Sequence, residues 1–304
     1  MNKNLFQRKG YVILFALMAM ASWGCAYPFI KLGMKEFQIL NTDFGGKILF
    51  AGIRFFCAGI LTLVISYFMK QSIIIKSSKE WSWLFVFGLV NTGLHYLFFY
   101  IGLSNCTGSK ASIIDSLGTF WLIILACIIF KENINFKKIV GCLLGFLGII
   151  IANVGIDIGS GFSLAGEGMM ILNTICAAFG GIITRIITRK INAIVATGYS
   201  LSIGGLILTI SGIACGGEIT HITLKGLFLL CGLIAISVVG FVLYNQLICY
   251  NPVSEIAIFN ALIPVFGTIF SCIMLKEKFS YRYLAAIAII ATAIYIINFQ
   301  DKSK

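Results

Sequence analysis

The chain has 304 residues, of which 59% are apolar and only 11% charged, and its formal net charge is +12. Ordinary soluble domains carry about a quarter charged residues, so this composition excludes a water-soluble globule and predicts a polytopic membrane protein. The basic residues stand in short segments between apolar runs, where they indicate orientation in the membrane and no nucleic-acid partner.

Ten apolar segments follow one another along the chain. Each has about 20 residues, which at a helical rise of about 1.5 Å per residue crosses the ~30 Å hydrocarbon core of a bilayer. The predicted spanning helices are Tyr11–Ile30, Gly46–Met69, Trp81–Gly102, Ser109–Phe130, Lys138–Val154, Gly168–Thr188, Ile194–Ala214, Leu224–Ile248, Val253–Leu275 and Tyr283–Phe299. The first segment continues to Phe29 without a small-residue cleavage site, so we expect a retained helix and not a signal peptide.

One stretch of the sequence occurs twice. Ser109–Glu132 recurs in the second half as Ser254–Glu277, and both copies are apolar segments that begin with serine and end in Lys-Glu. The chain therefore consists of two halves, residues 1–157 and 158–304, with five helices each. An odd number of spans per half inserts the second half upside down. The expected fold class is an all-α integral membrane protein of ten transmembrane helices, arranged as two inverted five-helix repeats.

Orientation follows from the distribution of Lys and Arg. With ten spans both termini lie on one side, and the larger share of the basic residues falls in the segments on that side. Because short cytoplasmic loops are enriched in Lys and Arg, we predict that both termini are cytoplasmic. The turn between the last two helices, residues 276–282, is basic but would then lie outside, a local exception that an inverted duplication would leave.

Several motifs together resemble the EamA-type permeases of the drug/metabolite transporter superfamily, over nearly the whole chain. They are ASWGCAYPFIKLG at Ala21–Gly33, AGIRFFCAGIL at Ala51–Leu61, and the SKASIIDSL…KE and SEIAIFNALIPVF…KEK patterns of the repeated stretch. The resemblance implies an inner-membrane carrier with a cavity between the repeats that exports small metabolites. One departure is that Thr119, beside Gly118, stands opposite Pro264, so any kink in the fourth helix would have to arise at Gly118.

Ionisable side chains within spans identify candidate site residues, because they are costly in lipid and usually face the bundle interior or a cavity. Asp115, whose counterpart is Asn260, could couple transport to protons or hold a cationic substrate; the alternative is a carboxylate paired or solvated near the membrane surface. His95 could relay a proton, or hold a neighbouring helix through a hydrogen bond. Arg54 is interpreted as reaching towards lipid headgroups, with a carboxylate or phosphate clamp as the alternative.

Aromatic residues add to the candidate site. Trp23, Tyr27, Tyr96 and Tyr244 could bind flat or cationic solutes by stacking and cation–π contact, although packing and interfacial belts use the same residues. The predicted substrate-binding residues are Trp23, Tyr27, His95, Tyr96, Asp115, Tyr244 and Asn260. Scattered cysteines without a CxxC pair and only two histidines predict no metal, cofactor or catalytic residues. Glu132 and Glu277 are interpreted as helix caps or interface charge pairs.

These features predict a carrier driven by a gradient, since the sequence has no P-loop pattern for ATP. Our leading hypothesis is a secondary active transporter that exports amino acids or related small metabolites by alternating access. The alternative is an importer of a small cationic or amine solute. A membrane-embedded enzyme is disfavoured, because Asp115 and His95 are the sole acid and base that the spans offer. The expected partners are the substrate, the lipid bilayer and a coupling ion that could be the proton, in a monomer or homodimer.

Overall fold

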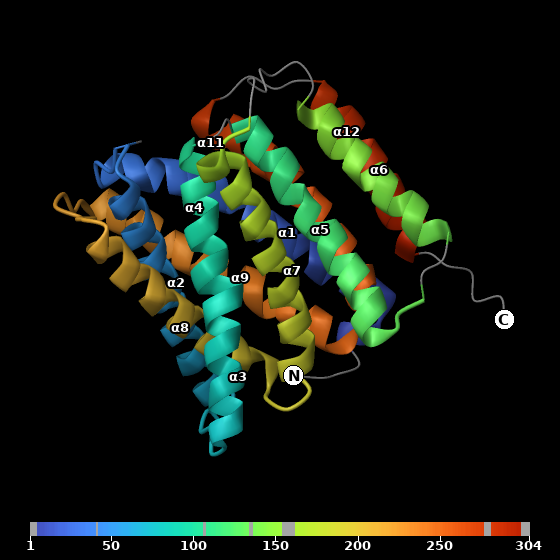
Figure 1. The fold of residues 1–304 in the computed structure, drawn as a ribbon, viewed down its shortest axis with the longest axis horizontal. Helices are drawn as coiled ribbons and strands as arrows, with labels where there is room; N and C mark the ends of the chain where they lie inside the picture. The colour runs from blue at the N-terminus through green and yellow to red at the C-terminus, as the bar shows by residue number, and fades with distance from the viewer. Residues whose placement is uncertain are drawn as a thin grey trace.

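The computed structural model describes residues 5–40, 42–105, 108–133, 136–153, 162–276 and 281–298. Within these residues every regular element is a helix, which confirms the predicted all-α class (Figure 1). The elements are η1 (Leu5–Gln7), α1 (Lys9–Glu36), α2 (Phe44–Phe68), α3 (Ser78–Gly88), η2 (Leu89–Leu94), α4 (His95–Asn105), α5 (Gly108–Phe130), α6 (Phe136–Asn153), η3 (Leu164–Gly168), α7 (Met169–Ile187), α8 (Ala193–Ala214), α9 (Leu224–Tyr250), α10 (Val253–Ala257), η4 (Ile258–Leu262), α11 (Ile263–Leu275) and α12 (Arg282–Asn298). Residues 1–4, 277–280 and 299–304, which include Glu277 and the chain ends, lie outside the described residues.

Seven helical segments of the described chain are long and apolar enough to cross a membrane. They are Lys9–Glu36, Phe44–Phe68, Ser78–Asn105, Leu164–Ile187, Ala193–Ala214, Leu224–Tyr250 and Val253–Leu275. Shorter apolar helical stretches occupy Ile114–Phe130 and Ile287–Ile296. The chain therefore has the helices of a multi-pass membrane protein, and the total of ten spans stays a prediction.

Three of the long helices change their winding along their length. A π-helical segment, η2, joins α3 to α4, and a second, η3, opens α7. A 3-10 segment, η4, lies between α10 and α11 and ends just before Pro264, which stands at the start of α11. A proline ring lacks the N–H that would continue the α-helical ladder, which accounts for the break at η4. The π-helical segments have no such signal in their sequence.

Helices α2 and α8 pack face to face, antiparallel and very close together. Glycines repeat every seventh residue along the contact, at Gly45, Gly52 and Gly59 in α2 and at Gly198, Gly205 and Gly212 in α8. A Cβ atom on Gly59 would lie 2.3 Å from the backbone nitrogen of Ser202, and one on Gly212 would lie 2.5 Å from that of Leu49. Small residues at such a contact let two membrane helices approach backbone to backbone.

The remaining helices pack around a central space. Helix α1 contacts α9 and α11, whereas α7 contacts α4 and α5. Helices α6 and α12 lie side by side at one edge of the bundle, away from α2 and α8 (Figure 1). The largest apolar core joins α1, α5, α7, α9 and the α10–α11 region, with Met20, Leu247 and Phe259 fully buried in it. This arrangement leaves the cavity between α1, α4, α5 and α9.

Candidate functional site

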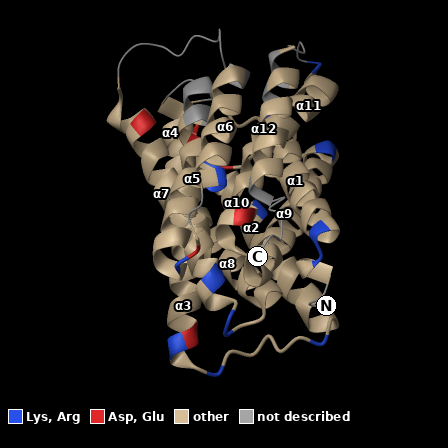
Figure 2. Ribbon diagram, turned by 90° about the vertical axis from the view of Figure 1, so that its right-hand side faces the viewer, with Lys and Arg blue, Asp and Glu red and all other residues tan. Residues whose placement is uncertain are grey.

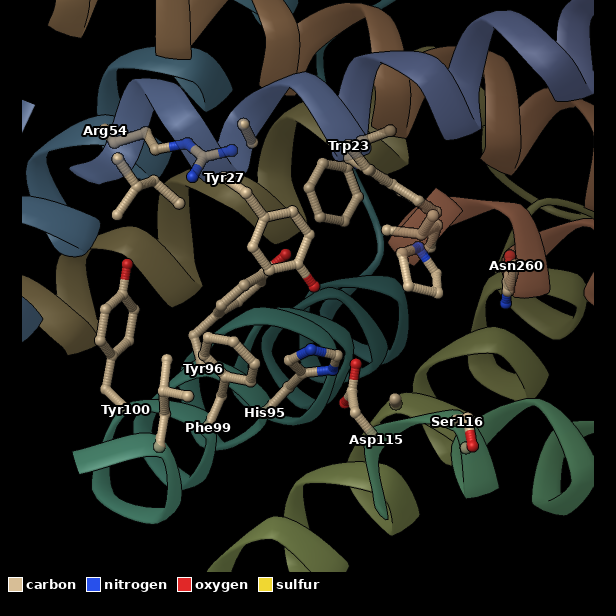
Figure 3. Close-up of a pocket in the computed structure, with 18 of the residues that line it drawn as sticks. Trp23, Tyr27, Arg54, His95, Tyr96, Phe99, Tyr100, Asp115, Ser116 and Asn260 are labelled. Atoms are coloured by element: carbon tan, nitrogen blue, oxygen red, sulfur yellow. The ribbon is translucent and has the colours of Figure 1, made fainter. Parts of the chain in front are cut away.

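A cavity of about 1270 Å³ lies inside the bundle. Its lining includes exposed residues just at and beyond the end of α1, such as Lys35 and Leu40, so it opens at that end of the bundle. Other lining residues, such as Thr184 and Asn245, are buried. The structure brings all of the predicted substrate-binding residues to this one cavity, several of them seen in Figure 3: Trp23, Tyr27, His95, Tyr96, Asp115, Tyr244 and Asn260.

Asp115 comes from α5 and points into the cavity (Figure 3). Its Oδ1 accepts a hydrogen bond of 2.6 Å from the Nδ2 of Asn173 on α7. The Oδ1 of Asn173 is buried and has no hydrogen-bond partner within the described residues. Asp115 is therefore a carboxylate oriented by a neutral amide at the cavity wall, and no Lys or Arg of the described chain forms an ion pair with it. This arrangement leaves its charge available to a ligand.

His95 reaches the cavity from the residue that follows the π-helical segment η2. A π-turn adds a residue to the helical turn and so rotates the residues after it relative to a regular helix. Within η2, the Nδ2 of Asn91 donates to the hydroxyl of Ser200 on α8 at 3.4 Å, and Thr92 also contacts that hydroxyl. The buried Nδ1 of His95 has no hydrogen-bond partner in the part of the chain that the structure describes. The hydrogen bonds to α8 therefore come from Asn91 and Thr92 of η2, and the Nδ1 of His95 takes no part in them.

Aromatic rings form the wall opposite α5. The indole of Trp23 lies 5.0 Å from the ring of Tyr244, centre to centre, and its Nε1 edge rests on Gly240, where a Cβ would come within 2.6 Å. The hydroxyl of Tyr244 accepts a 3.1 Å hydrogen bond from the Nδ2 of Asn260 in η4. Asn260 keeps a buried Oδ1 without a partner among the described residues. Gly240 follows His95 by 145 residues, the spacing of the repeated stretch, and its missing side chain leaves room for the indole of Trp23.

The interpretation that the Arg54 side chain reaches towards the lipid headgroups is wrong. It is only 3% exposed and lines the cavity from α2. Its Nε donates to the hydroxyl of Ser237 on α9 at 2.8 Å, and its guanidinium carbon lies 4.8 Å from the centre of the Phe55 ring. These contacts hold the cation inside the bundle. The sequence could not show this, because an apolar helix does not reveal which of its faces is turned inward.

Lys47 is a cavity residue that the sequence analysis missed. It belongs to the first turns of α2, where a lysine is expected at a membrane surface, yet it is 9% exposed. Its Nζ donates to the hydroxyl of Ser104 at the end of α4 at 3.1 Å. Together with Lys31 and Lys35 of α1, it makes the open end of the cavity strongly basic.

The opposite end of the bundle is closed by polar contacts between the halves. The carboxylate of Glu132, just after α5, accepts hydrogen bonds from the backbone nitrogens of Val253 at 2.7 Å and Ser254 at 3.0 Å, and from the Ser254 hydroxyl. The Nζ of Lys138 donates to the same hydroxyl at 2.8 Å. At the same end, but within the second half, Arg185 of α7 donates to two carbonyls in the last turn of α9. Glu132 is therefore a helix cap, as predicted, but it caps the helix of the other half.

Comparison with known proteins decides the family. The pattern of the EamA-like transporter family matches residues 10–154 and 164–299. The chain belongs to the EamA-like transporter family. It is 27% identical to a WAT1-related chloroplast protein of Arabidopsis thaliana over 92% of this chain and 67% of that protein. It is also 24% identical to YvbV of Bacillus subtilis, named an uncharacterized transporter, over 99% of this chain and 95% of that protein.

A solved crystal structure supports the fold of this EamA-like chain. The two superpose with a TM-score of 0.73 at 15% identity, over 93% of this chain and 94% of the other. At that identity the likeness concerns the fold alone. The family and the apolar helices make the protein a multi-pass membrane transporter. They agree with the expected membrane transporter, and the relatives carry the names of transporters and not of enzymes.

Proposed function

We propose that this EamA-like protein is a secondary active exporter of amino acids or related small metabolites that works by alternating access. The observation that carries the proposal is a cavity open at one end of the bundle and closed at the other by contacts between the two halves. A carrier needs such one-sided access to move a solute without opening a continuous pore. The working unit in this proposal is a monomer or a homodimer.

The helix contacts support two inverted five-helix repeats, residues 1–157 and 158–304. In that scheme α2 corresponds to α8 and α6 to α12, and each of these pairs packs together across the bundle. Helix α1 corresponds to η3–α7, and the contacts of α1 with α9 and α11 have counterparts in those of α7 with α4 and α5. The close antiparallel contact of α2 and α8 is what a twofold axis in the membrane plane would produce. The rocking of one half against the other follows as the proposed movement.

Charge distribution supports cytoplasmic termini in the inner membrane. Figure 2 shows Lys and Arg gathered in the loops at the end of the bundle where the N-terminus lies, including the loop between α2 and α3. Short cytoplasmic loops are enriched in these residues. With this orientation the cavity opens to the outside, and the contacts of Glu132 and Lys138 close the cytoplasmic side. The structure would then represent the state after substrate release.

The cavity wall suits a small polar solute with an apolar part. Asp115 could hold an ammonium group, Trp23 and Tyr27 could contact the rest of the solute, and the free Oδ1 of Asn260 could accept a hydrogen bond. Asp115 and His95 are also the proposed path for a coupling proton, because both are ionisable groups that line the cavity. A carboxylate beside aromatic rings equally favours the second candidate function, import of a small amine.

Solute exchange by the protein reconstituted into liposomes tests this proposal. The purified protein is reconstituted into liposomes loaded with single amino acids, amines, nucleosides or sugar phosphates, and counterflow of the labelled solute is measured. We expect counterflow of an amino acid that is lost in a Trp23→Ala, Tyr27→Ala double variant. Counterflow of amines alone would favour the importer hypothesis. No counterflow with any member of the panel would contradict the proposed substrate class.

A matched control separates the cavity from general damage. Trp81 belongs to α3, is 43% exposed and does not line the cavity. Trp81→Ala should therefore leave counterflow close to that of the unmodified protein. A thermal-shift measurement with the same solutes adds an independent readout, because a ligand that binds the folded protein raises its apparent stability.

A further inference from the structure

Arg54 is a cation in the cavity wall that has no acidic partner among the described residues. We propose that its guanidinium binds the carboxylate group of the transported solute. The inference rests on the proposed function, since it assigns one end of the substrate of that same cavity. It predicts that substrates carry a carboxylate, and that solutes without one are rejected.

Burial is the first argument. A buried charge is costly unless it is paired with an opposite charge or fully hydrogen-bonded. Arg54 is 3% exposed, and its hydrogen bond runs from Nε to the neutral hydroxyl of Ser237. Its guanidinium also lies over the ring of Phe55, which is neutral. Within the described residues no carboxylate forms an ion pair with Arg54. A bound carboxylate would supply the missing charge.

The orientation of the side chain is the second argument. Ser237 donates its own proton to the carbonyl of Leu233 at 2.8 Å, which leaves its oxygen free to accept from Arg54. With Nε fixed and Phe55 against the planar group, the two terminal nitrogens remain for a ligand. Their parallel N–H groups match the two oxygens of a carboxylate. Figure 3 shows the guanidinium on the same side of the cavity as Tyr100.

The third argument is the arrangement of charge around the cavity. Arg54, Tyr96 and Asp115 all line this cavity, and Tyr96 interacts electrostatically with both the cation and the carboxylate. Tyr27 is likewise close to Asp115. A dipolar solute could place its carboxylate at Arg54 and its ammonium group at Asp115. The basic residues Lys31, Lys35 and Lys47 surround the open end, where they would favour the approach of an anionic group.

A carboxylate fits this site better than a phosphate group. Phosphate sites commonly combine a cation with several backbone N–H groups at a helix N-terminus. Arg54 instead lies well inside α2, and Ser237 lies in the interior of α9. Inorganic phosphate is therefore included in the test as the competing anion.

The test compares acids with their neutral amides. Thermal shifts of the full chain in detergent are titrated with L-leucine, L-glutamine and L-phenylalanine, with the primary amide of each, and with inorganic phosphate. We expect the unmodified protein to bind at least one acid about ten- to a hundredfold more tightly than its amide, the range expected for a charge-assisted hydrogen bond. Arg54→Gln should abolish this difference. Arg54→Lys keeps the charge without the fork and should reduce it, and Ser237→Ala should also reduce it.

Arg189→Gln is the matched control. Arg189 is an exposed arginine over the ring of Phe130, outside the cavity, so its replacement should leave the difference between acid and amide unchanged. If Arg54→Gln fails to fold, as judged by gel filtration, Arg54→Lys and Ser237→Ala decide the question. Equal affinities for acid and amide, no binding of either, or an acid preference that survives in the Arg54 variants would each overturn the inference. So would binding of phosphate in place of the acids.

Counterflow keeps this inference separate from the proposed function. If the protein exchanges an amino acid but its preference for acids over amides does not depend on Arg54, the proposed transport stands and the proposed carboxylate site is wrong. Acid binding that depends on Arg54, without exchange of any solute, would keep the carboxylate site and contradict transport.

Discussion

The two copies of the repeated stretch, so similar in sequence, take different backbone conformations. The first forms α5, an uninterrupted α-helix from Gly108 to Phe130. The second is divided into α10, the 3-10 segment η4 and α11. The expectation that a kink in the first copy would arise at Gly118 finds no break in the winding of α5. A shared apolar pattern thus fixes that both copies are helical, but not how each is wound.

One pair of residues accounts for the difference. In a regular helix the N–H of Thr119 bonds to the carbonyl of Asp115, four residues earlier. At the same place in the second copy Pro264 has no N–H, so the carbonyl of Asn260 loses its helical partner. Asp115 and Asn260 are repeat counterparts, and both line the cavity. The interruption therefore falls at the site, where the two halves already differ in charge.

The largest predicted effect comes from giving α5 the proline of its counterpart. Thr119→Pro places a proline inside an uninterrupted helix at a residue that is 7% exposed. We expect the free energy of unfolding to fall by about 3 kcal/mol or more, because one helical hydrogen bond is lost and the ring clashes with the preceding turn. Thermal unfolding in detergent measures the loss, with Thr119→Ser as the control. A variant as stable as the control would show that α5 is already as strained as its counterpart.

The second prediction concerns the contact between the copies. Glu132, after the end of α5, receives three hydrogen bonds from the start of α10. Glu132→Ala leaves those donors unpaired, and we expect a loss of about 2 kcal/mol in the free energy of unfolding. We also expect faster modification of a cysteine introduced at buried Ile187, the last residue of α7, which does not line the cavity, in a background without reactive native cysteines. Glu80→Ala, on exposed α3, serves as the control. Unchanged cysteine reactivity would argue that Glu132 does not keep this end closed.

The extent to which the sequence predicts this molecule follows from the physics of lipid. Apolar length fixes where helices lie, because unpaired backbone groups are excluded from hydrocarbon. Polar residues in spans face the interior for the same reason, so the candidates Asp115, His95 and Asn260 could be found together. The winding at η2 and the inward direction of Arg54 could not, because both depend on contacts with distant residues such as Ser200 and Ser237.

The glycines of α2 and α8 are a different case. Their seven-residue spacing is visible in the sequence and could have predicted a close helix contact. What the spacing cannot give is the partner, since six glycines on two helices allow several pairings. Likewise, Gly240 by itself does not predict the indole of Trp23 that rests on it. Complementary sizes become informative only when the neighbours are known.

The third prediction replaces the charged residue Asp115 by asparagine, the residue that its counterpart Asn260 already is. In Asp115→Asn, the new amide can donate to the unpartnered Oδ1 of Asn173, so the hydrogen bond between α5 and α7 is replaced. We expect the free energy of unfolding to change by about 1 kcal/mol or less. Solute uptake driven by a proton gradient should fall at least tenfold, whereas counterflow without a proton gradient should persist. Asn173→Ala, which removes the partner and keeps the carboxylate, should retain the response to the gradient. Gradient-driven transport by Asp115→Asn would exclude this carboxylate as the coupling group.

The smallest predicted effect removes the proline from the second copy. Pro264→Ala restores a donor for the carbonyl of Asn260, and because Pro264 stands in the first turn of α11 its ring strains little there. We expect the free energy of unfolding to change by about 0.5 kcal/mol. The more informative result is functional. A second copy as continuous as α5 would hold Asn260 in one position, so exchange should slow while solute binding in the thermal-shift assay remains. If exchange and binding are both unchanged, the break at η4 does not affect transport. The functional difference between the two copies then lies in the side chains of Asp115 and Asn260.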